Sequence, residues 1–222
     1  MFGLDKSKLQ LYFIAGTKNV GDKGLLEVLE AALKGGITAF QLREKGDGAL
    51  QGDDLRALAE QCLKLCKAYQ VPFIVNDDVE LALEVGADGV HVGQTDGVIS
   101  EIRAKIGPSK ILGVSTHAMN EALTASDAGA NYIGVGPLFE TSSKANVGEP
   151  VGPGLVREIV KELPGLPLVG IGGISERKAG TVIREGASGV AVISAIAGAA
   201  DVEEAARAIK GRITLALTGV EM

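Results

Sequence analysis

The chain has 222 residues, of which 46% are hydrophobic and 23% charged, and this ordinary globular usage excludes a disordered protein. Its formal net charge of −6 argues against a surface that binds nucleic acid or an anionic membrane, because both need a positive field. The longest stretch without a charge, 186–200, is shorter than the roughly 18 apolar residues that cross a bilayer, so we expect no membrane span.

The start of the chain lacks the basic, apolar and small-residue order of a signal peptide, because Asp5, Lys6 and Lys8 precede its first apolar run. We therefore expect a cytoplasmic protein. Its two cysteines, Cys62 and Cys66, lie four positions apart in an apolar stripe of helical spacing. They are predicted to be buried thiols of the core.

Short apolar runs alternate with longer amphipathic stretches along the whole chain, which is typical of an α/β protein. Eight runs are predicted to be strands: 11–15, 39–42, 73–76, 89–92, 111–114, 132–135, 168–171 and 190–193. Eight strand–helix units in a chain of this length fit a (β/α)8 TIM barrel better than an open sheet. Since no linker or change of composition divides the chain, we predict a single domain over 1–222.

A glycine shortly before every second strand supports this count. Gly36, Gly86, Gly129 and Gly186 precede the second, fourth, sixth and eighth strands, at intervals of 50, 43 and 57 residues. Each interval therefore holds two strand–helix units, as in a barrel built from four repeats. Each of these glycines is predicted to end a helix with a positive φ.

Polar residues gather where the predicted strands end, which is the end of such a barrel that carries its chemistry. After the second strand, the alternation of side chains turns Gln41, Arg43 and Lys45 to one side. Six later strands also run out into polar or glycine residues, and these are Asn76, Asp77, Gln94, Asp96, Ser115, Thr141, Ser142, Ser143, Lys144, Gly172, Gly173 and Ser194.

Asp77 and Asp96 follow neighbouring strands, so their carboxylates can approach one ion, and hard oxygen ligands of this kind suit magnesium. Arg43, Lys45 and Lys144 add three cations to the same end of the barrel. Magnesium together with several cations can neutralise a pyrophosphate, whose charge must be balanced before it leaves.

A simpler alternative stays open at this point. Asp77 and Asp78 would then cap the following helix, while the cations would pair with Glu44 or Glu140 in solvent. This alternative does not explain why five charged groups all stand at strand ends.

A second anion site is predicted after the seventh and eighth strands. Gly172 and Gly173 would let the backbone approach a ligand closely, and the small residues that follow Ile193 and Ser194 could offer the amides of a helix N-terminus. This is the usual phosphate position of TIM barrels. The sequence therefore predicts two phosphate-bearing ligands, one with magnesium and one without.

The two histidines give a weaker signal. His91 lies within the fourth strand and is predicted to face the barrel interior as a hydrogen-bonded packing residue. His117 follows the fifth strand and lies near the same end of the barrel, but no serine or cysteine makes a convincing triad with it.

This constellation closely resembles thiamine-phosphate synthase. The matching segments occur in the family's order and cover nearly the whole chain, and they are 41–45, 75–78, 89–96, 113–115, 134–137, 169–174 and 193–196. The resemblance implies a transferase that uses Mg²⁺. Such an enzyme joins the pyrimidinylmethyl group of hydroxymethylpyrimidine pyrophosphate to the ring nitrogen of a thiazole phosphate and releases pyrophosphate.

The resemblance also implies roles for particular residues. Contacts to the pyrimidine pyrophosphate fall on Gln41, Leu42, Arg43, Glu44, Lys45, Asn76, Ser115 and Lys144. The metal ligands fall on Asp77 and Asp96, and contacts to the thiazole phosphate fall on Thr141, Ser142, Ser143, Gly173, Ile193 and Ser194. The residues expected to act in the reaction are Arg43, Lys45, Ser115 and Lys144. The family commonly has Thr-x-Thr-Lys after the sixth strand, whereas this chain has a serine at the third position, Ser143, which keeps the hydroxyl.

Three other functions compete with this one. A thiazole tautomerase on the same barrel is expected to lack the paired aspartates and the full Gln-x-Arg-x-Lys segment. A sugar-phosphate isomerase or lyase would need a general acid–base pair among the strand ends. A non-catalytic sensor of thiamine precursors would be expected to have lost a cation or a metal ligand. The partners we expect are small-molecule substrates, and the sequence does not indicate an oligomeric state.

Overall fold

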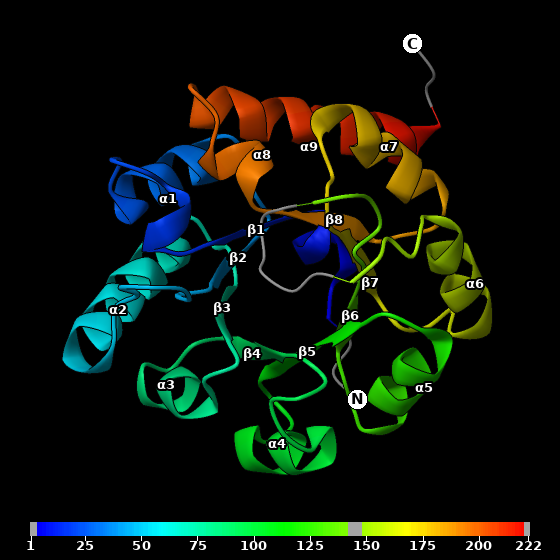
Figure 1. The fold of residues 1–222 in the computed structure, drawn as a ribbon, viewed down its shortest axis with the longest axis horizontal. Coiled ribbons are helices and arrows are strands. Elements are labelled where there is room, and N and C mark those ends of the chain that lie inside the picture. Colours follow the sequence, from blue (N-terminus) through cyan, green and yellow to red (C-terminus); the bar gives the residue numbers. More distant parts are fainter. Residues whose placement is uncertain (1–3, 142–147, 220–222) are drawn as a thin grey trace.

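The protein is a closed barrel of eight parallel strands in chain order, from β1 to β8, with β8 pairing back onto β1. This computed structural model describes residues 4–141 and 148–219. Figure 1 shows the strands as an inner ring and the helices as an outer ring. The predicted (β/α)8 TIM-barrel fold is confirmed.

The strands are short and buried. Their bounds are β1 Leu11–Ala15, β2 Ala39–Leu42, β3 Phe73–Asn76, β4 Gly89–Val92, β5 Ile111–Thr116, β6 Tyr132–Val135, β7 Leu168–Ile171 and β8 Gly189–Val192. Six of these eight strands have the predicted bounds.

A helix follows every strand, and a short helix precedes the first. The helices are η1 Lys6–Leu9, η2 Thr17–Asn19, α1 Leu25–Lys34, α2 Gly52–Ala68, α3 Val79–Glu84, α4 Ile99–Ile106, α5 Met119–Asp127, α6 Gly154–Glu162, α7 Glu176–Arg184, α8 Ser194–Ala197 and α9 Val202–Thr218. Among the described residues, no helix is long and apolar enough to span a membrane.

The alternation of side chains along each strand divides the apolar residues into two cores. Outward-facing residues such as Phe13, Phe40 and Phe73 pack against the helices, and inward-facing residues such as Tyr12 and Ile14 fill the barrel. The inward set also contains Leu9, because η1 lies across the N-terminal end of the barrel, where Figure 1 shows it inside the ring of strands. The barrel interior is therefore a packed core.

The four repeated glycines have the backbone that their positions predict. Gly36, Gly86, Gly129 and Gly186 have φ values of +94°, +70°, +88° and +100°, and each follows a helix that leads into a strand. A residue with a Cβ rarely adopts this conformation, so these positions favour glycine.

Two strands differ from their predicted bounds. β5 continues past Val114, because Ser115 and Thr116 keep pairing with Gly134 and Val135 of β6 although the apolar run has ended. β8 begins one residue earlier than predicted and ends at Val192, and Ile193 instead caps the short helix α8 with φ −115° and ψ −85°.

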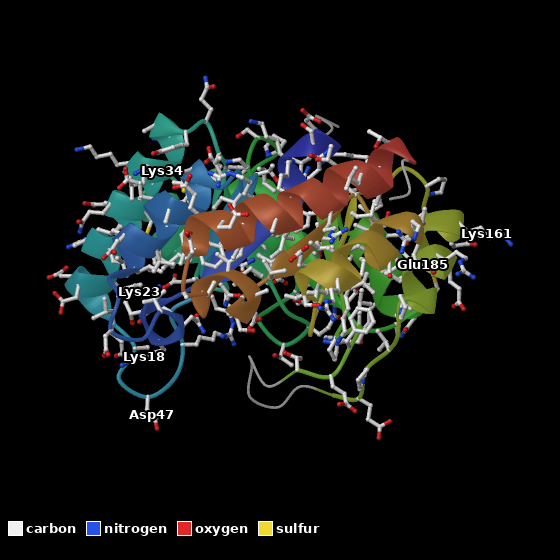
Figure 2. All side chains as sticks on the ribbon, turned by 90° about the horizontal axis from the view of Figure 1, so that it is seen from above. Lys18, Lys23, Lys34, Asp47, Lys161 and Glu185 are labelled. Carbon is white, nitrogen blue, oxygen red and sulfur yellow. The ribbon has the colours of Figure 1, made fainter. Side chains whose placement is uncertain are left out.

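The loops that follow the strands gather at one end of the barrel, which we call the mouth. In Figure 2, Lys18 and Asp47, on the loops after β1 and β2, lie at this end. Lys34, the last residue of α1, lies at the opposite end (Figure 2). Cys62 and Cys66 are buried thiols on α2, as predicted, and burial raises the pKa of Cys62 to about 12.

Candidate active site

Three charged side chains meet at the mouth where β2, β3 and β4 end. Asp77 follows β3, Asp96 lies in the loop after β4, and Lys45 lies in the loop after β2 and forms an ion pair with Asp77. The Asp77 backbone has a φ of +61°, a conformation that aspartate tolerates better than most residues. Its amide donates to the carbonyl of His91 at 2.8 Å, which ties this residue to β4.

The electrostatics of this cluster leave a carboxylate pair short of positive charge. Burial raises the pKa of Asp77 above its ordinary value, Lys45 opposes the rise, and a hydrogen bond with Asp96 adds to it. An oxygen of Asp96 also accepts from the Gly93 amide at 2.7 Å, which fixes this carboxylate beside the end of β4. The structure therefore brings together the two aspartates that the sequence pairs.

The two carboxylates suit a magnesium ion. Mg²⁺ is usually held by one or two carboxylates together with water and substrate phosphate, rather than by a complete set of protein ligands. Residues 4–141 and 148–219 hold no group of three or more His, Cys, Asp or Glu side chains that could bind a metal. Asp77, whose pKa is raised, contacts a second carboxylate, and a divalent cation would stabilise such a pair of donors.

Arg43 extends this cluster toward the middle of the mouth. It is half-buried, its amide donates to Ala15 at 2.9 Å, and its side chain lines a cavity of about 470 Å³. Burial lowers the pKa of the Arg43 guanidinium, and the nearby Asp77 charge opposes this. Asn76, at the end of β3, lines a smaller cavity of about 280 Å³ beside Lys45 and Asp77.

Two residues of the 41–45 segment line the 280 Å³ cavity but are held by other parts of the protein. The Leu42 side chain packs in the core between the barrel and the helices. The Glu44 carboxylate accepts from the hydroxyl of Thr17, from the Thr17 amide at 2.7 Å and from the Leu50 amide at 3.1 Å. Glu44 therefore holds the loops after β1 and β2 together and does not pair with Lys45.

The simpler alternative for the aspartates holds for one of them. Asp78 caps α3, because its carboxylate accepts from the Leu81 amide at 2.9 Å. Asp77 does not cap this helix, since its side chain contacts Lys45 and Asp96 instead.

The other half of the mouth is a cavity with few charges. The same 470 Å³ cavity is lined by Thr141, by the loops after β7 and β8, and by Ser115 of β5. Gly172 and Gly173 have φ values of +95° and +63°, and a Cβ on Gly173 would lie 2.3 Å from the Glu140 carbonyl oxygen. These two positions therefore favour glycine, and backbone forms this wall of the cavity.

Helix α8 begins in this cavity with the residues that sequence analysis singled out. Ile193, Ser194 and Ala195 line it, and α8 starts at Ser194. The predicted contacts Ser142, Ser143 and Lys144 lie outside the described residues.

Buried polar side chains connect the two halves through the barrel interior. Nε2 of Gln41 donates to the Tyr12 hydroxyl at 2.9 Å, and the Tyr12 hydroxyl lies 2.8 Å from that of Tyr132. Nδ1 of His91 lies 2.9 Å from the Tyr132 hydroxyl, and Nε2 of His91 lies 2.9 Å from Oγ of Ser115. His91 is thus an interior hydrogen-bonded residue, as predicted.

Sequence reasoning did not find Tyr12 or Tyr132. A signal was present, because both tyrosines stand at inward-facing positions of strands, where a phenol needs a polar partner. It also left His117 without a role. His117 lines the 470 Å³ cavity, and its Nδ1 lies 3.2 Å from a carboxylate oxygen of Glu121.

Comparisons with known proteins show the family of this chain. A family model described as Thiamine monophosphate synthase matches residues 11–196. The Thiamine-phosphate synthase of Geobacillus kaustophilus is 52% identical over 213 residues, which are 96% of this chain and 96% of that protein. The enzyme of the same name from Bacillus licheniformis is 51% identical over 209 residues, or 94% of this chain and 92% of its own.

Solved structures give the same result. Thiamine phosphate pyrophosphorylase from Pyrococcus furiosus has a TM-score of 0.85 and 35% identity, and the match covers 96% of this chain and 98% of that one. A structure described as native KDPGal has a TM-score of 0.71 but only 17% identity, so it shares the fold alone. The chain belongs to the thiamine monophosphate synthase family, and it is a transferase enzyme of the thiamine-phosphate synthase kind.

Proposed function

We propose that this chain, as a single barrel domain, catalyses the Mg²⁺-dependent condensation of hydroxymethylpyrimidine pyrophosphate with thiazole phosphate. The products are thiamine phosphate and pyrophosphate. One observation carries the proposal: a charged cluster around Arg43, Asp77 and Asp96 shares the mouth with a cavity walled by glycine backbone. The charged cluster suits a leaving group whose negative charge grows during the reaction. The cavity suits an acceptor that must be held in the right orientation.

In the first step, the bond between the pyrimidine methylene carbon and the pyrophosphate oxygen breaks, and pyrophosphate keeps the electron pair. The aminopyrimidine ring stabilises the positive charge left on the methylene carbon. Arg43 presents a planar set of donors that matches phosphate oxygens, and its half-buried position favours a strong contact. Lys45 would leave its ion pair with Asp77 and bind the pyrophosphate instead.

Magnesium would be held by Asp77 and Asp96. When bound, it supplies positive charge that stabilises the departing pyrophosphate. Asp77 and Asp96 carry the negative charge that would keep the ion in the site. Lys45, which pairs with Asp77 in this structure, is near enough to help neutralise the pyrophosphate.

In the second step, the ring nitrogen of the thiazole attacks the methylene carbon with its own lone pair. The reaction needs no general base, because this nitrogen carries no proton that must be removed. The loops with Gly173 and Ser194 would hold the phosphate of the acceptor and thereby aim its ring. Thr141 lies on the same wall and would add a hydroxyl contact.

The test is a measurement of thiamine phosphate and pyrophosphate formed from the two phosphorylated precursors, with Mg²⁺ and again with excess chelator. Equal amounts of the two products, abolished by the chelator, are expected. Product formed equally well with chelator would remove the metal from the proposal. No product from a folded protein would favour a thiazole tautomerase or a precursor-binding protein instead.

A further inference from the structure

Five polar side chains from five strands form one continuous series across the barrel interior. They come from β2, β1, β6, β4 and β5, in the order Gln41, Tyr12, Tyr132, His91 and Ser115. The four contacts between them measure 2.9, 2.8, 2.9 and 2.9 Å. We call the first four residues the interior chain, and it ends on the hydroxyl of Ser115 at the cavity wall.

The interior chain is deeply buried and closely packed. Tyr12 and Gln41 are 1% exposed, and Tyr132 is fully buried. A Cβ on Gly113 would lie 2.3 Å from the Tyr132 hydroxyl and 2.5 Å from Nδ1 of His91, so the glycine of β5 leaves only the room that these groups need. Burying polar groups costs free energy that an apolar side chain would not incur, and a role in stability alone does not account for this choice.

The donor at the Gln41 end gives the series a direction. The Gln41 amide nitrogen can only donate, so the Tyr12 oxygen accepts from it. Within the described residues, the only other partner of the Tyr12 hydroxyl is Tyr132, so the Tyr12 proton goes to the Tyr132 oxygen. This order of donors directs the Tyr132 proton to Nδ1 of His91, which lies 2.9 Å away and must then accept it.

The direction has a consequence at Ser115. If Nδ1 of His91 accepts, its neutral ring carries the proton on Nε2, which donates to Oγ of Ser115. The hydroxyl proton of Ser115 is then turned away from His91 and toward the cavity that Arg43 also lines. The Ser115 backbone is held as well, because Nε2 of Gln94 donates to its carbonyl at 2.6 Å.

We propose that the interior chain positions the Ser115 hydroxyl as a hydrogen-bond donor toward the anionic pyrimidine pyrophosphate. Tyr12, Tyr132 and His91 are positioning residues, and no proton moves along them during turnover. This inference rests on the proposed function for its substrate. The direction of the hydrogen bonds, however, is a property of the protein without ligand and can be tested without any reaction.

The direction is tested by nitrogen NMR of the unliganded protein at neutral pH, labelled with ¹⁵N in histidine. The chain has two histidines, so a His117→Gln variant assigns the signals. The expected result is that His91 is neutral, with a proton on Nε2 and none on Nδ1. A proton on Nδ1, whether in the other tautomer or in an imidazolium, would overturn the proposed direction. This measurement needs no change to the interior chain and therefore does not depend on a variant that folds.

The effect on catalysis is tested by a double-mutant cycle between Tyr132→Phe and Ser115→Ala. Alone, Tyr132→Phe is expected to lower kcat/KM for the pyrimidine pyrophosphate about tenfold, as for one lost charge-assisted hydrogen bond. In the Ser115→Ala background, the same change is expected to cost less than about threefold, because the donor it positions is gone. A further loss above about threefold would show that Tyr132 acts independently of Ser115 and would overturn the proposal.

Tyr69→Phe is the matched control. Tyr69 is 37% exposed at the end of α2, so this substitution removes the same hydroxyl oxygen far from the barrel interior. It is expected to leave kcat/KM unchanged. If the protein forms no thiamine phosphate at all, the proposed function fails, while the histidine tautomer still decides whether the interior chain has the stated direction.

Discussion

The two halves of the mouth are built differently, and under the proposed function each would hold an anion by its own means. Where β2, β3 and β4 end, the means are charged side chains, and Lys45, Asp77 and Asp96 already neutralise one another in part. Where β7 and β8 end, the means are backbone and small residues, with Gly173 held at a positive φ and α8 starting at Ser194. Under the proposed function, this gives a division of labour: the charged half would respond to charge that develops in the reaction, and the glycine half would place a group whose charge stays constant.

Removing the half-buried cation of the charged half should have the largest effect. Arg43→Ala is expected to lower kcat by about 10²–10³, the range seen when a donor to a developing anion is lost. Arg43→Lys should restore part of this loss, because it keeps the charge but not the planar donors. Steady-state kinetics with both substrates provide the test, and an effect confined to the KM of the thiazole phosphate would contradict the division of labour.

Removing either metal-binding candidate should raise the Mg²⁺ requirement. Asp77→Ala and Asp96→Ala are each expected to raise the half-saturating Mg²⁺ concentration by at least about tenfold, since each removes one of two carboxylate ligands. Binding of the thiazole phosphate, measured by calorimetry, should change little.

Asp78→Ala is the matched control for these aspartates, because its carboxylate caps α3. It is expected to lower the free energy of unfolding by about 1 kcal/mol and to leave the Mg²⁺ requirement unchanged. If the Asp77→Ala and Asp96→Ala variants lost thiazole phosphate binding as strongly as they lost Mg²⁺ binding, the two halves would not be separate sites.

A methyl group added to the glycine wall, where β7 and β8 end, should weaken binding of the thiazole phosphate. Gly173→Ala puts a Cβ 2.3 Å from the Glu140 carbonyl oxygen at a φ of +63°, so the loop must shift. We expect the KM for thiazole phosphate to rise about tenfold, equivalent to about 1.4 kcal/mol, with a smaller change in kcat. Gly165→Ala, where a Cβ meets nothing within 4 Å, should leave both constants unchanged. A fall in kcat alone for Gly173→Ala would argue against a placing role.

Loss of one hydroxyl in the same half should have the smallest effect. Ser194→Ala is expected to raise the KM for thiazole phosphate by about three- to tenfold, as for one hydrogen bond from an exposed hydroxyl to the phosphate. Ser100→Ala, an exposed position on α4, provides the control and should change neither constant. A tenfold loss of kcat at saturating acceptor would move Ser194 into the reaction step itself.

The barrel was predictable from the sequence because its signals are local. An apolar run of four or five residues and a following helix recur eight times, and Gly36, Gly86, Gly129 and Gly186 need only their own backbone conformation to be recognised. The ends of β5 and β8 were wrong by one or two residues, because strand pairing with β6 and β7 decides them. Apolarity alone does not report this pairing.

Parts of the candidate site were predictable because their residues lie at or shortly after the C-terminal end of a strand, and these ends meet at one mouth. This placed Arg43 and Ser115 on the cavity wall and brought Asp77 to Asp96. It did not show that the Glu44 carboxylate turns back to Thr17, because this contact joins two loops that are distant in the sequence. Such a contact depends on how β1 and β2 pair.

The pairing of β1 with β8 has a consequence for how the enzyme is made. Leu11 pairs with Val190, so the ring of strands cannot close until β8 has been synthesised and can pair with β1. Synthesis proceeds from the N-terminus, and pairing across such a separation is slow. A growing chain therefore contains the charged residues that follow β2, β3 and β4 early, while the wall formed after β7 and β8 is still missing. Until β8 arrives, β1 presents an unpaired edge to other growing chains, which makes this interval the period of greatest risk of aggregation.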